Sequence, residues 1–401
     1  MLLTGYREKP FAHDRRKSLV DRVRSYPECL PRSGYHVGGY ALTLQAKGRW
    51  YRAGTENMRM PTSLDIAQLA GVSQSTVSRA LRGDPMVSRK TRERIRAIAR
   101  QLDYTVDKNA SNLRLQQTHT LALLFFEDPT SDESNINPFF LSMQGSIARV
   151  CSERGYDLLV SFQQMSRNWH AEYTGSHKAD GLILLGYGDF LAYRGKLDAL
   201  VQSGTRFVRW GPMLPEQFGL SIGSDNPLGG RVVTEHLVAQ GRRRIAFLGA
   251  PEHSPEVMER YRGYEAALRT AGIAIDPALR IDAETTEQSG HDAVLSLLDR
   301  GLAFDAVFGA SDLIAIGAMR ALIDRGLVVP DDVAVVGFDD IAMARSVTPS
   351  LTTVVQDTRR AGRLLVEALI NLIEGKPVHS ARLPTHLIVR HSSVAADSTA
   401  A

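Results

Sequence analysis

The segment QSTVSRAL places short or planar polar side chains on one face of a predicted helix: Gln74, Ser75, Ser78 and Arg79. Such groups can reach the edges of bases in a major groove, with Arg79 suited to a guanine and Gln74 to an adenine. Ser73 and Thr76 could hydrogen-bond to phosphate oxygens, and we expect Thr62 to contact DNA as well. This chemistry indicates recognition of DNA. The alternative is the solvated polar face of any small three-helix bundle.

The pentapeptide Gly219–Gly223 matches the GxSxG pattern of serine hydrolases, and Asp339 and His386 follow Ser221 in the chain order of that fold. The context contradicts a hydrolase, because a nucleophile elbow needs an apolar strand directly before the serine and a helix directly after it. Here GPMLPEQF precedes the serine, and the helical pattern begins only at Asn226. Zinc, Walker and dinucleotide motifs do not occur in the sequence either. We therefore expect no enzyme and no cofactor.

The polar segment lies in a pattern of three short helices. Thr62 or Ser63 can cap a first helix whose apolar positions recur through LDIAQLA, and Gly71 ends it. Ser73 caps the second helix, and Ser88 caps a third helix that carries arginines opposite its apolar stripe. Two short helices joined by a tight turn predict a helix-turn-helix, whose second helix offers its first turn to the major groove.

From Thr120 the chain alternates apolar strand-like runs with helix-like runs, which is typical of a doubly wound parallel sheet. The alternation restarts after Gly223. We therefore expect two sheets in two lobes, with a cleft between them at the carboxyl ends of the strands. The segment SARLPTHLIVRHSS is expected to supply one last strand.

The 401 residues carry a formal net charge of +4 that is distributed unevenly. Residues 1–57 and 58–118 each carry +6, whereas residues 119–401 carry −8. This asymmetry indicates a polyanion-binding segment fused to a body that does not bind polyanions. Two cysteines are too few for a disulfide framework, and no apolar run is long enough to span a membrane, so we expect a cytoplasmic protein.

Residues 1–57 show no sustained period and contain stretches rich in glycine, proline, arginine and tyrosine. We interpret them as a poorly ordered basic arm. Because Met58 and Met60 directly precede the first patterned segment, the alternative is an upstream extension that the working protein lacks.

Eight motifs along the chain together resemble the LacI/GalR family of transcriptional regulators. They are LDIAQLAGVSQSTVSRAL, VSRKTRERIRAIARQLDY, NPFF, SDNPLGGRVVTEHLVAQGRRRIAFLG, ERYRGYEAAL, SDLIAIGAMRAL, DVAVVGFDDI and PSLTTV. The resemblance runs from Thr62 to about Ser393. It implies an N-terminal all-α helix-turn-helix DNA-binding domain followed by an α/β, periplasmic-binding-protein-like effector domain of two lobes.

In that family a short hinge helix follows the third helix, and a leucine in it wedges into the minor groove at the centre of the operator. The resemblance places the hinge in DKNASNLRL, with Asn109 and Ala110 at the DNA and Leu113 as the wedge. Val106 stands where the family usually has proline, which makes the start of the hinge less rigid. Packing of Leu113 against the body of the protein is the alternative.

The resemblance also implies residues that bind a small effector: Asn137, Phe139, Trp210, Arg260, Ser311, Asp312 and Asp339. Arg260 matches the family's ligand-binding arginine, and Asp339 matches the aspartate that accepts from the ligand. A sugar suits charged bidentate partners and an aromatic platform, which Trp210 could supply. The alternatives are a structural ion pair between Arg260 and Asp339 and plain packing of Trp210.

These expectations divide the chain into five segments: a basic extension at 1–57, the helix-turn-helix domain at 58–106, the hinge at 107–118, the effector-binding and dimerisation domain at 119–393, and a frayed tail at 394–401. We expect a homodimer, or a tetramer, that binds a palindromic operator and represses carbohydrate-utilisation genes until a sugar releases it. A purine or another small molecule is the alternative effector. A sugar-binding receptor without DNA function is the alternative class of protein.

Overall fold

The computed structural model describes residues 61–104, 117–125, 136–162, 168–186, 190–213 and 219–394, with the backbone alone for 190–192. It also gives the backbone of two short antiparallel strands, β1 (Leu44–Ala46) and β2 (Arg49–Tyr51). The chain divides into two units, Met1–Val106 and Asp107–Ala401. The expected hinge residues Asn109, Ala110 and Leu113 lie outside the described residues.

The first unit contains the predicted three helices: α2 (Ser63–Ala70), α3 (Gln74–Leu81) and α4 (Arg89–Gln101). Thr62 caps α2 and forms a reciprocal capping box with Asp65, while Ser73 and Ser88 cap α3 and α4 as predicted. Gly71 ends α2 in the left-handed conformation, with φ of 60°. The apolar faces of the helices meet in one small core: Ile66, Ala67, Ala70, Val77, Ala80, Val87, Ile95 and Ala99. This packing leaves the polar face of α3 at the surface.

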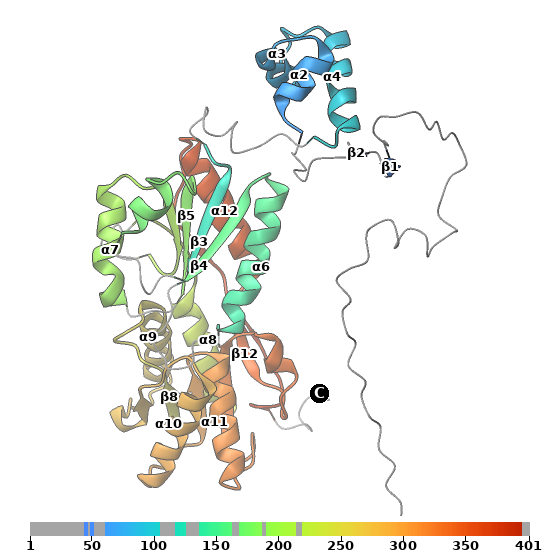
Figure 1. Ribbon diagram of the computed structural model, residues 1–401. Helices are drawn as coiled ribbons and strands as arrows, with labels where there is room; N and C mark the ends of the chain where they lie inside the picture. Colours follow the sequence, from blue (N-terminus) through green and yellow to red (C-terminus); the bar gives the residue numbers. More distant parts are fainter. Residues whose placement is uncertain are drawn as a thin grey trace, which may run out of the picture. The chain divides into compact units, whose positions relative to one another are not determined.

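The first lobe of the second unit contains a six-stranded parallel sheet in the order β13-β7-β6-β5-β3-β4. Its strands are β3 (Thr120–Phe125), β4 (Asp157–Phe162), β5 (Gly181–Leu185), β6 (Phe207–Trp210), β7 (Leu220–Ser224) and β13 (Ala381–Leu383). Its helices are α6 (Pro138–Glu153), α7 (Phe190–Gln202) and α12 (Thr358–Ile373), with a π-helical turn at His170–Thr174. Side chains alternate between the faces of β3, so that Leu121 and Leu123 pack with α6 while Ala122 and Leu124 pack with α7. Figure 1 shows α7 on the opposite side of this sheet from α6 and α12.

The second lobe contains another six-stranded sheet, in the order β14-β12-β11-β10-β8-β9. Its strands are β8 (Ile245–Leu248), β9 (Arg280–Ile281), β10 (Ala306–Gly309), β11 (Ala334–Asp339), β12 (Thr352–Val355) and β14 (His386–Ile388). Its helices are α8 (Asn226–Ala239), α9 (Pro255–Thr270), α10 (Glu287–Asp299) and α11 (Asp312–Asp324), with short 3-10 turns at Pro277–Leu279 and Ala342–Arg345. All its strands are parallel except β14, which is antiparallel to β12. The predicted pair of sheets is confirmed.

One prediction about the strands was wrong, and one strand was not predicted. The tail segment supplies two strands, because β13 joins the first sheet and β14 joins the second. The segment around Ser221 is a strand, β7, although its serines and glycine gave no apolar run to detect. As a result the chain passes between the lobes three times: after β7, between β12 and α12, and between β13 and β14.

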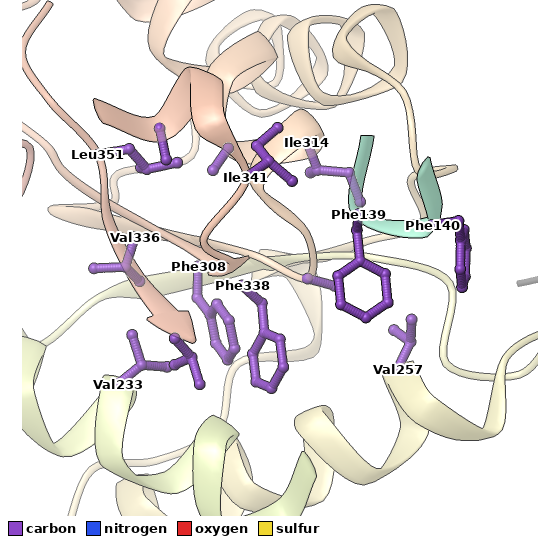
Figure 2. Close-up of a cluster of buried hydrophobic side chains, with 14 of the residues drawn as sticks. Phe139, Phe140, Val233, Val257, Phe308, Ile314, Val336, Phe338, Ile341 and Leu351 are labelled. Carbon is purple, nitrogen blue, oxygen red and sulfur yellow. The ribbon is translucent and has the colours of Figure 1, made fainter. Parts of the chain in front are cut away.

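Buried apolar side chains from both lobes belong to one hydrophobic cluster. Figure 2 shows Phe139 and Phe140 of α6, from the first lobe, with Val257 of α9 and Phe338 of β11, from the second. The polar residues considered below therefore lie beside a well-packed junction between the lobes.

Candidate functional site

The polar face of α3 is exposed, and most of its side chains are oriented by partners within the same unit. Gln74 Nε2 donates to Ser63 Oγ at 2.8 Å. The Ser73 hydroxyl hydrogen-bonds with those of Ser75 at 2.8 Å and Thr76 at 2.9 Å. The structure thus brings Gln74, Ser75 and the two hydroxyls of Ser73 and Thr76 to the start of α3, where a recognition helix contacts DNA.

Arg79 also lies on this face, with 60% of its side chain exposed, and its Nε is 4.0 Å from Asp84 Oδ2. Ser78 is half-buried. The Thr62 hydroxyl donates to Asp65 Oδ2 at 2.7 Å, so this side chain serves the cap of α2. Arg79 therefore has the longest polar side chain on this face that could reach a base.

Two of the arginines on α4 bind carbonyls of their own unit instead of lining a uniform basic face. Arg92 NH1 donates to the carbonyl of Gly83 at 2.9 Å, and Arg94 NH2 donates to the carbonyl of Ala70. These bonds connect α4 to the ends of α3 and α2. Both guanidinium groups therefore have a role within the unit itself.

Close packing of α8 on α9 positions the candidate effector-binding arginine. A Cβ on Gly230 would lie 2.1 Å from the carbonyl oxygen of Arg260, and one on Gly263 would lie 2.2 Å from that of Pro227. Only glycine allows the two backbones to approach this closely. Gly229 instead faces the sheet, since its Cβ would lie 2.6 Å from Phe338.

Arg260 is 1% exposed, and its guanidinium is held on several sides. Nε donates to Asn226 Oδ1 at 3.0 Å, and NH1 donates to the carbonyl of Ala310. The group lies 3.9 Å from the centre of the Phe338 ring, and its NH2 is 4.0 Å from Asp339 Oδ1. The structure therefore brings Arg260 and Asp339 together, as predicted from the sequence.

Two buried carboxyl groups lie close to Arg260, at the carboxyl ends of strands of the second sheet. Asp339, at the end of β11 with φ of 125°, accepts from Gln356 Nε2 at 2.6 Å. Asp312 Oδ2 accepts from the backbone N–H of Ile341 at 2.8 Å, and its Oδ1 accepts from the Thr353 hydroxyl. Burial, followed by the charge of Asp339, raises the pKa of Asp312 to about 8.

Among the other candidate effector residues, two are N-cap residues of helices and one is an aromatic residue packed in the core. Ser311 caps α11 and Asn137 caps α6, accepting from the N–H of Phe139 at 2.9 Å. Asn137 Nδ2 is buried with no hydrogen-bond partner among the described residues. Trp210 is 4% exposed, with its ring 5.9 Å from that of Phe139, so in this arrangement it packs in the core.

A pocket of about 880 Å³ lies beside these residues, between the start of α6 and the second lobe. Pro138 and Leu313 line it, and they are the chain neighbours of Asn137 and Asp312. As far as the described residues show, the candidate effector residues do not line it themselves. Its acidic residues outnumber its one arginine, Arg320.

Sequence reasoning missed four residues at this junction: Asn226, Gln356, Arg209 and Glu256. Asn226 and Gln356 hold Arg260 and Asp339, and Arg209 and Glu256 are nearly buried charges. Gln356 directly follows β12, so its place after a buried strand was a usable signal. Glu256 lies one helical turn before Arg260 on α9, but no sequence pattern marks it as buried.

The hydrolase alternative has no geometric support. Ser221 lies within β7, is 2% exposed, and donates its hydroxyl to the carbonyl of Pro212 at 3.2 Å. Asp225 accepts from the N–H of Leu228 at 3.1 Å and caps α8. Within the described part of the chain, no cluster of metal-ligating residues occurs and no helix is long and apolar enough to cross a membrane.

Models of two protein families match the chain. Residues 62–107 match bacterial regulatory proteins of the lacI family, and residues 234–393 match a periplasmic binding protein-like domain. The first match overturns the alternative of a receptor without a DNA-binding domain.

Two curated relatives cover most of the chain. The HTH-type transcriptional regulator CelR of Thermobifida fusca is 35% identical over 84% of this chain and 99% of its own length. The ribose operon repressor of Escherichia coli K12 is 33% identical over 81% of this chain and 96% of its own.

Two solved structures are also similar. A lac repressor dimer bound to operator and the anti-inducer ONPF has a TM-score of 0.72 at 27% identity, covering 84% of this chain and all of the other. A complex of CelR with cellobiose has a TM-score of 0.60 at 34% identity, covering 83% and 99%. The helix-turn-helix unit, the two mainly parallel sheets and these likenesses agree: the chain belongs to the LacI family of DNA-binding transcriptional regulators, which are not enzymes.

Proposed function

We propose that this regulator is a cytoplasmic repressor of carbohydrate-utilisation genes, released from its operator when a sugar binds in the second unit. The observation that carries the sugar assignment is the buried set of Arg260, Asp339 and Gln356 at the junction of the lobes. Such charged and amide groups suit the hydroxyls of a polyol, which both donates and accepts. The names of two relatives, one bound to cellobiose and one a ribose operon repressor, favour the same class of ligand.

For DNA, we propose that Gln74, Ser75, Ser78 and Arg79 read base edges, and that Thr62, Ser73 and Thr76 lie at phosphates. The exposed polar face of α3 supports this assignment. Gln74 Nε2 donates one N–H to the Ser63 hydroxyl, so its second N–H and Oε1 remain for a base. The proposed hinge at 107–118, with Asn109 and Ala110 at the DNA and Leu113 as wedge, rests on the sequence alone.

We further propose a homodimer on a palindromic operator, because one helix-turn-helix makes too few contacts for specific affinity. Edge strand β4 carries the exposed apolar residues Leu159 and Phe162, and α6 carries Leu141, with exposures of 36%, 43% and 46%. An apolar edge strand favours association unless it is covered, and a second copy of the chain is the occupant we propose. Sedimentation of Phe162→Glu should show monomers where the wild type shows dimers.

The effector assignment is tested by isothermal calorimetry with cellobiose and D-ribose, followed by titration of operator DNA selected from a random pool. Binding of either sugar, with weaker operator affinity in its presence, is the expected result. Arg260→Met should weaken sugar binding by about 2–5 kcal/mol, because it leaves Asp339 without its cation. If a purine base binds and none of the sugars tested does, the assignment as a ligand-responsive regulator would remain, but the sugar assignment would be wrong.

A further inference from the structure

The chain leaves β11 through two consecutive residues whose backbone conformations favour glycine. Asp339 has φ of 125° and Asp340 has φ of 53°. Five non-glycine residues of the described chain have positive φ, and these two are the only neighbours among them. Such conformations persist only where surrounding contacts enforce them. Because Asp339 is a candidate effector residue, the contacts that enforce this exit loop, residues 339–341, also determine where its carboxylate lies.

The Asp340 carboxylate is bound by two arginines, and its side chain is only 6% exposed. Arg390 NH2 donates to Oδ1 at 2.5 Å, and Arg345 NH2 donates to Oδ2 at 2.8 Å. The two arginines differ in burial, since 12% of the Arg390 side chain is exposed against 66% of the Arg345 side chain. An exposed ion pair contributes little, whereas breaking a buried one leaves a charge unpaired. Arg390 is therefore the partner that holds Asp340.

Arg390 is itself bound to the second sheet. Its NH1 donates to the carbonyl of Leu351 at 2.7 Å, and its backbone N–H donates to the Thr352 hydroxyl at 2.8 Å. Ser392, two residues further along, is fully buried and bridges β12 and β11. The N–H of Thr352 donates to its hydroxyl at 2.8 Å, and that hydroxyl donates to the carbonyl of Val335 at 2.6 Å. The guanidinium is thus carried on a segment of backbone that is fixed to the two strands.

The N–H groups of the exit loop are held separately from its carboxylate. The N–H of Asp340 donates to Thr353 Oγ1 at 3.4 Å, and the N–H of Ile341 donates to Asp312 Oδ2 at 2.8 Å. Figure 2 shows Ile341 within the buried apolar cluster, which anchors the end of the loop. These contacts hold the backbone after Asp340, and Arg390 holds the side chain.

We infer that Arg390 is a positioning residue for the effector site. By binding the Asp340 carboxylate it keeps the exit loop in its left-handed conformation, and this conformation fixes the direction of Asp339. Arg390 is 50 positions from Asp340 in the sequence and follows β14, so the carboxyl-terminal segment takes part in shaping the site. The consequence for effector affinity rests on the proposed function, whereas the consequence for the exit loop does not.

Hydrogen exchange of the full chain without ligand, followed by mass spectrometry, tests the effect on the loop. Arg390→Met should speed exchange at Asp340 and Ile341 by roughly fivefold or more, because the contact that enforces the strained backbone is lost. Arg345→Met is the matched control, since it removes the exposed guanidinium from the same carboxylate, and exchange should stay within about twofold of wild type. Exchange in α10 of the same lobe should not change in either variant.

Arg390→Lys serves if Arg390→Met does not fold. Lysine keeps the positive charge but, as a single ammonium group, cannot hold Asp340 and the carbonyl of Leu351 with two separate nitrogens. It should therefore give a smaller increase in exchange at the same two amides. Wild-type exchange at these amides in both Arg390 variants would overturn the proposal. An equal increase in Arg345→Met, or an equal increase throughout the lobe, would also overturn it.

Calorimetric titration with cellobiose and D-ribose tests the effect on the site. Arg390→Met should weaken binding of the sugar that the wild type binds by roughly tenfold, and Arg345→Met should weaken it by less than about twofold. Glycine adopts φ of 53° without strain, so Asp340→Gly added to Arg390→Met should restore part of the lost affinity. A side chain that only stabilises the fold would not be rescued in this way.

The two measurements separate this inference from the proposed function. If the wild type binds neither sugar, the sugar assignment is contradicted, and hydrogen exchange still tests the role of Arg390 in the exit loop. If the wild type binds a sugar and Arg390→Met binds it equally well, the positioning role is wrong and the proposed function stands.

Discussion

Replacement of Asp312 by asparagine should make the second unit less sensitive to pH. The Asp312 carboxyl is fully buried, and its pKa is raised from 3.8 to about 8 by burial and by the charge of Asp339. Between these two values the native chain holds a proton that the unfolded chain has lost. The free energy of unfolding therefore falls as pH rises, by about 1.4 kcal/mol per pH unit for one proton.

From pH 5 to pH 7 this single group should lower the stability of the wild type by about 3 kcal/mol, and Asp312→Asn should not show that loss. Asparagine is a suitable replacement, because its carbonyl can still accept from the N–H of Ile341 and its amide can donate to the Thr353 hydroxyl. The variant should be relatively more stable as the pH increases.

Urea unfolding of both chains at pH 5, 6 and 7, followed by circular dichroism, measures the difference. Asp292→Asn is the control, since this carboxyl is 62% exposed on α10. Parallel stability curves for wild type and Asp312→Asn would refute the reasoning and show that Asp312 is ionised in the folded state throughout this range.

Four further outcomes are expected for operator binding. Affinity should fall roughly 10³-fold between 50 and 200 mM salt if about six phosphates are neutralised, and a flat profile in gel-shift titrations would contradict DNA binding through the basic segment. Arg79→Ala should cost about 1–3 kcal/mol and relax preference at one symmetric base pair, whereas equal loss on every sequence would mean that Arg79 meets phosphate. Leu113→Ala should reduce both affinity and the DNA bend seen by circular permutation, and an unchanged bend would favour packing of this leucine. A chain starting at Met58 should fold and keep its sequence preference; reduced specificity would show that residues 1–57 read DNA.

Local patterns in the sequence were sufficient for the first unit. The caps at Thr62, Ser73 and Ser88, the glycine at 71 and the apolar spacing all act within a few residues of one another, so the three helices follow from sequence. The roles of Arg92 and Arg94 did not follow, because their acceptors, the carbonyl of Gly83 in the turn after α3 and that of Ala70 at the end of α2, lie far from them in the sequence or in another element.

The sequence also determined the two α/β lobes, because apolar runs of strand length alternate with helical patterns and this favours parallel sheets. It did not determine which sheet each tail strand joins. β13 and β14 are three residues each and lack a distinctive pattern, so pairing with β7 and β12 decides their place. Family motifs implied that Arg260 and Asp339 lie together. In the structure they do, because α9 packs near the end of β11.

Only the tertiary structure revealed the charges at the junction of the lobes. Arg209 and Glu256 are 47 positions apart on elements of different sheets, and no local period marks either as buried. Gly211 has a φ of 144° and no side chain, and this is what leaves room for both charged groups. Whether a charged residue is solvated or held against an opposite charge depends on which elements pack around it. The sequence therefore determined the helix-turn-helix and the two lobes, while packing decided how the lobes are joined.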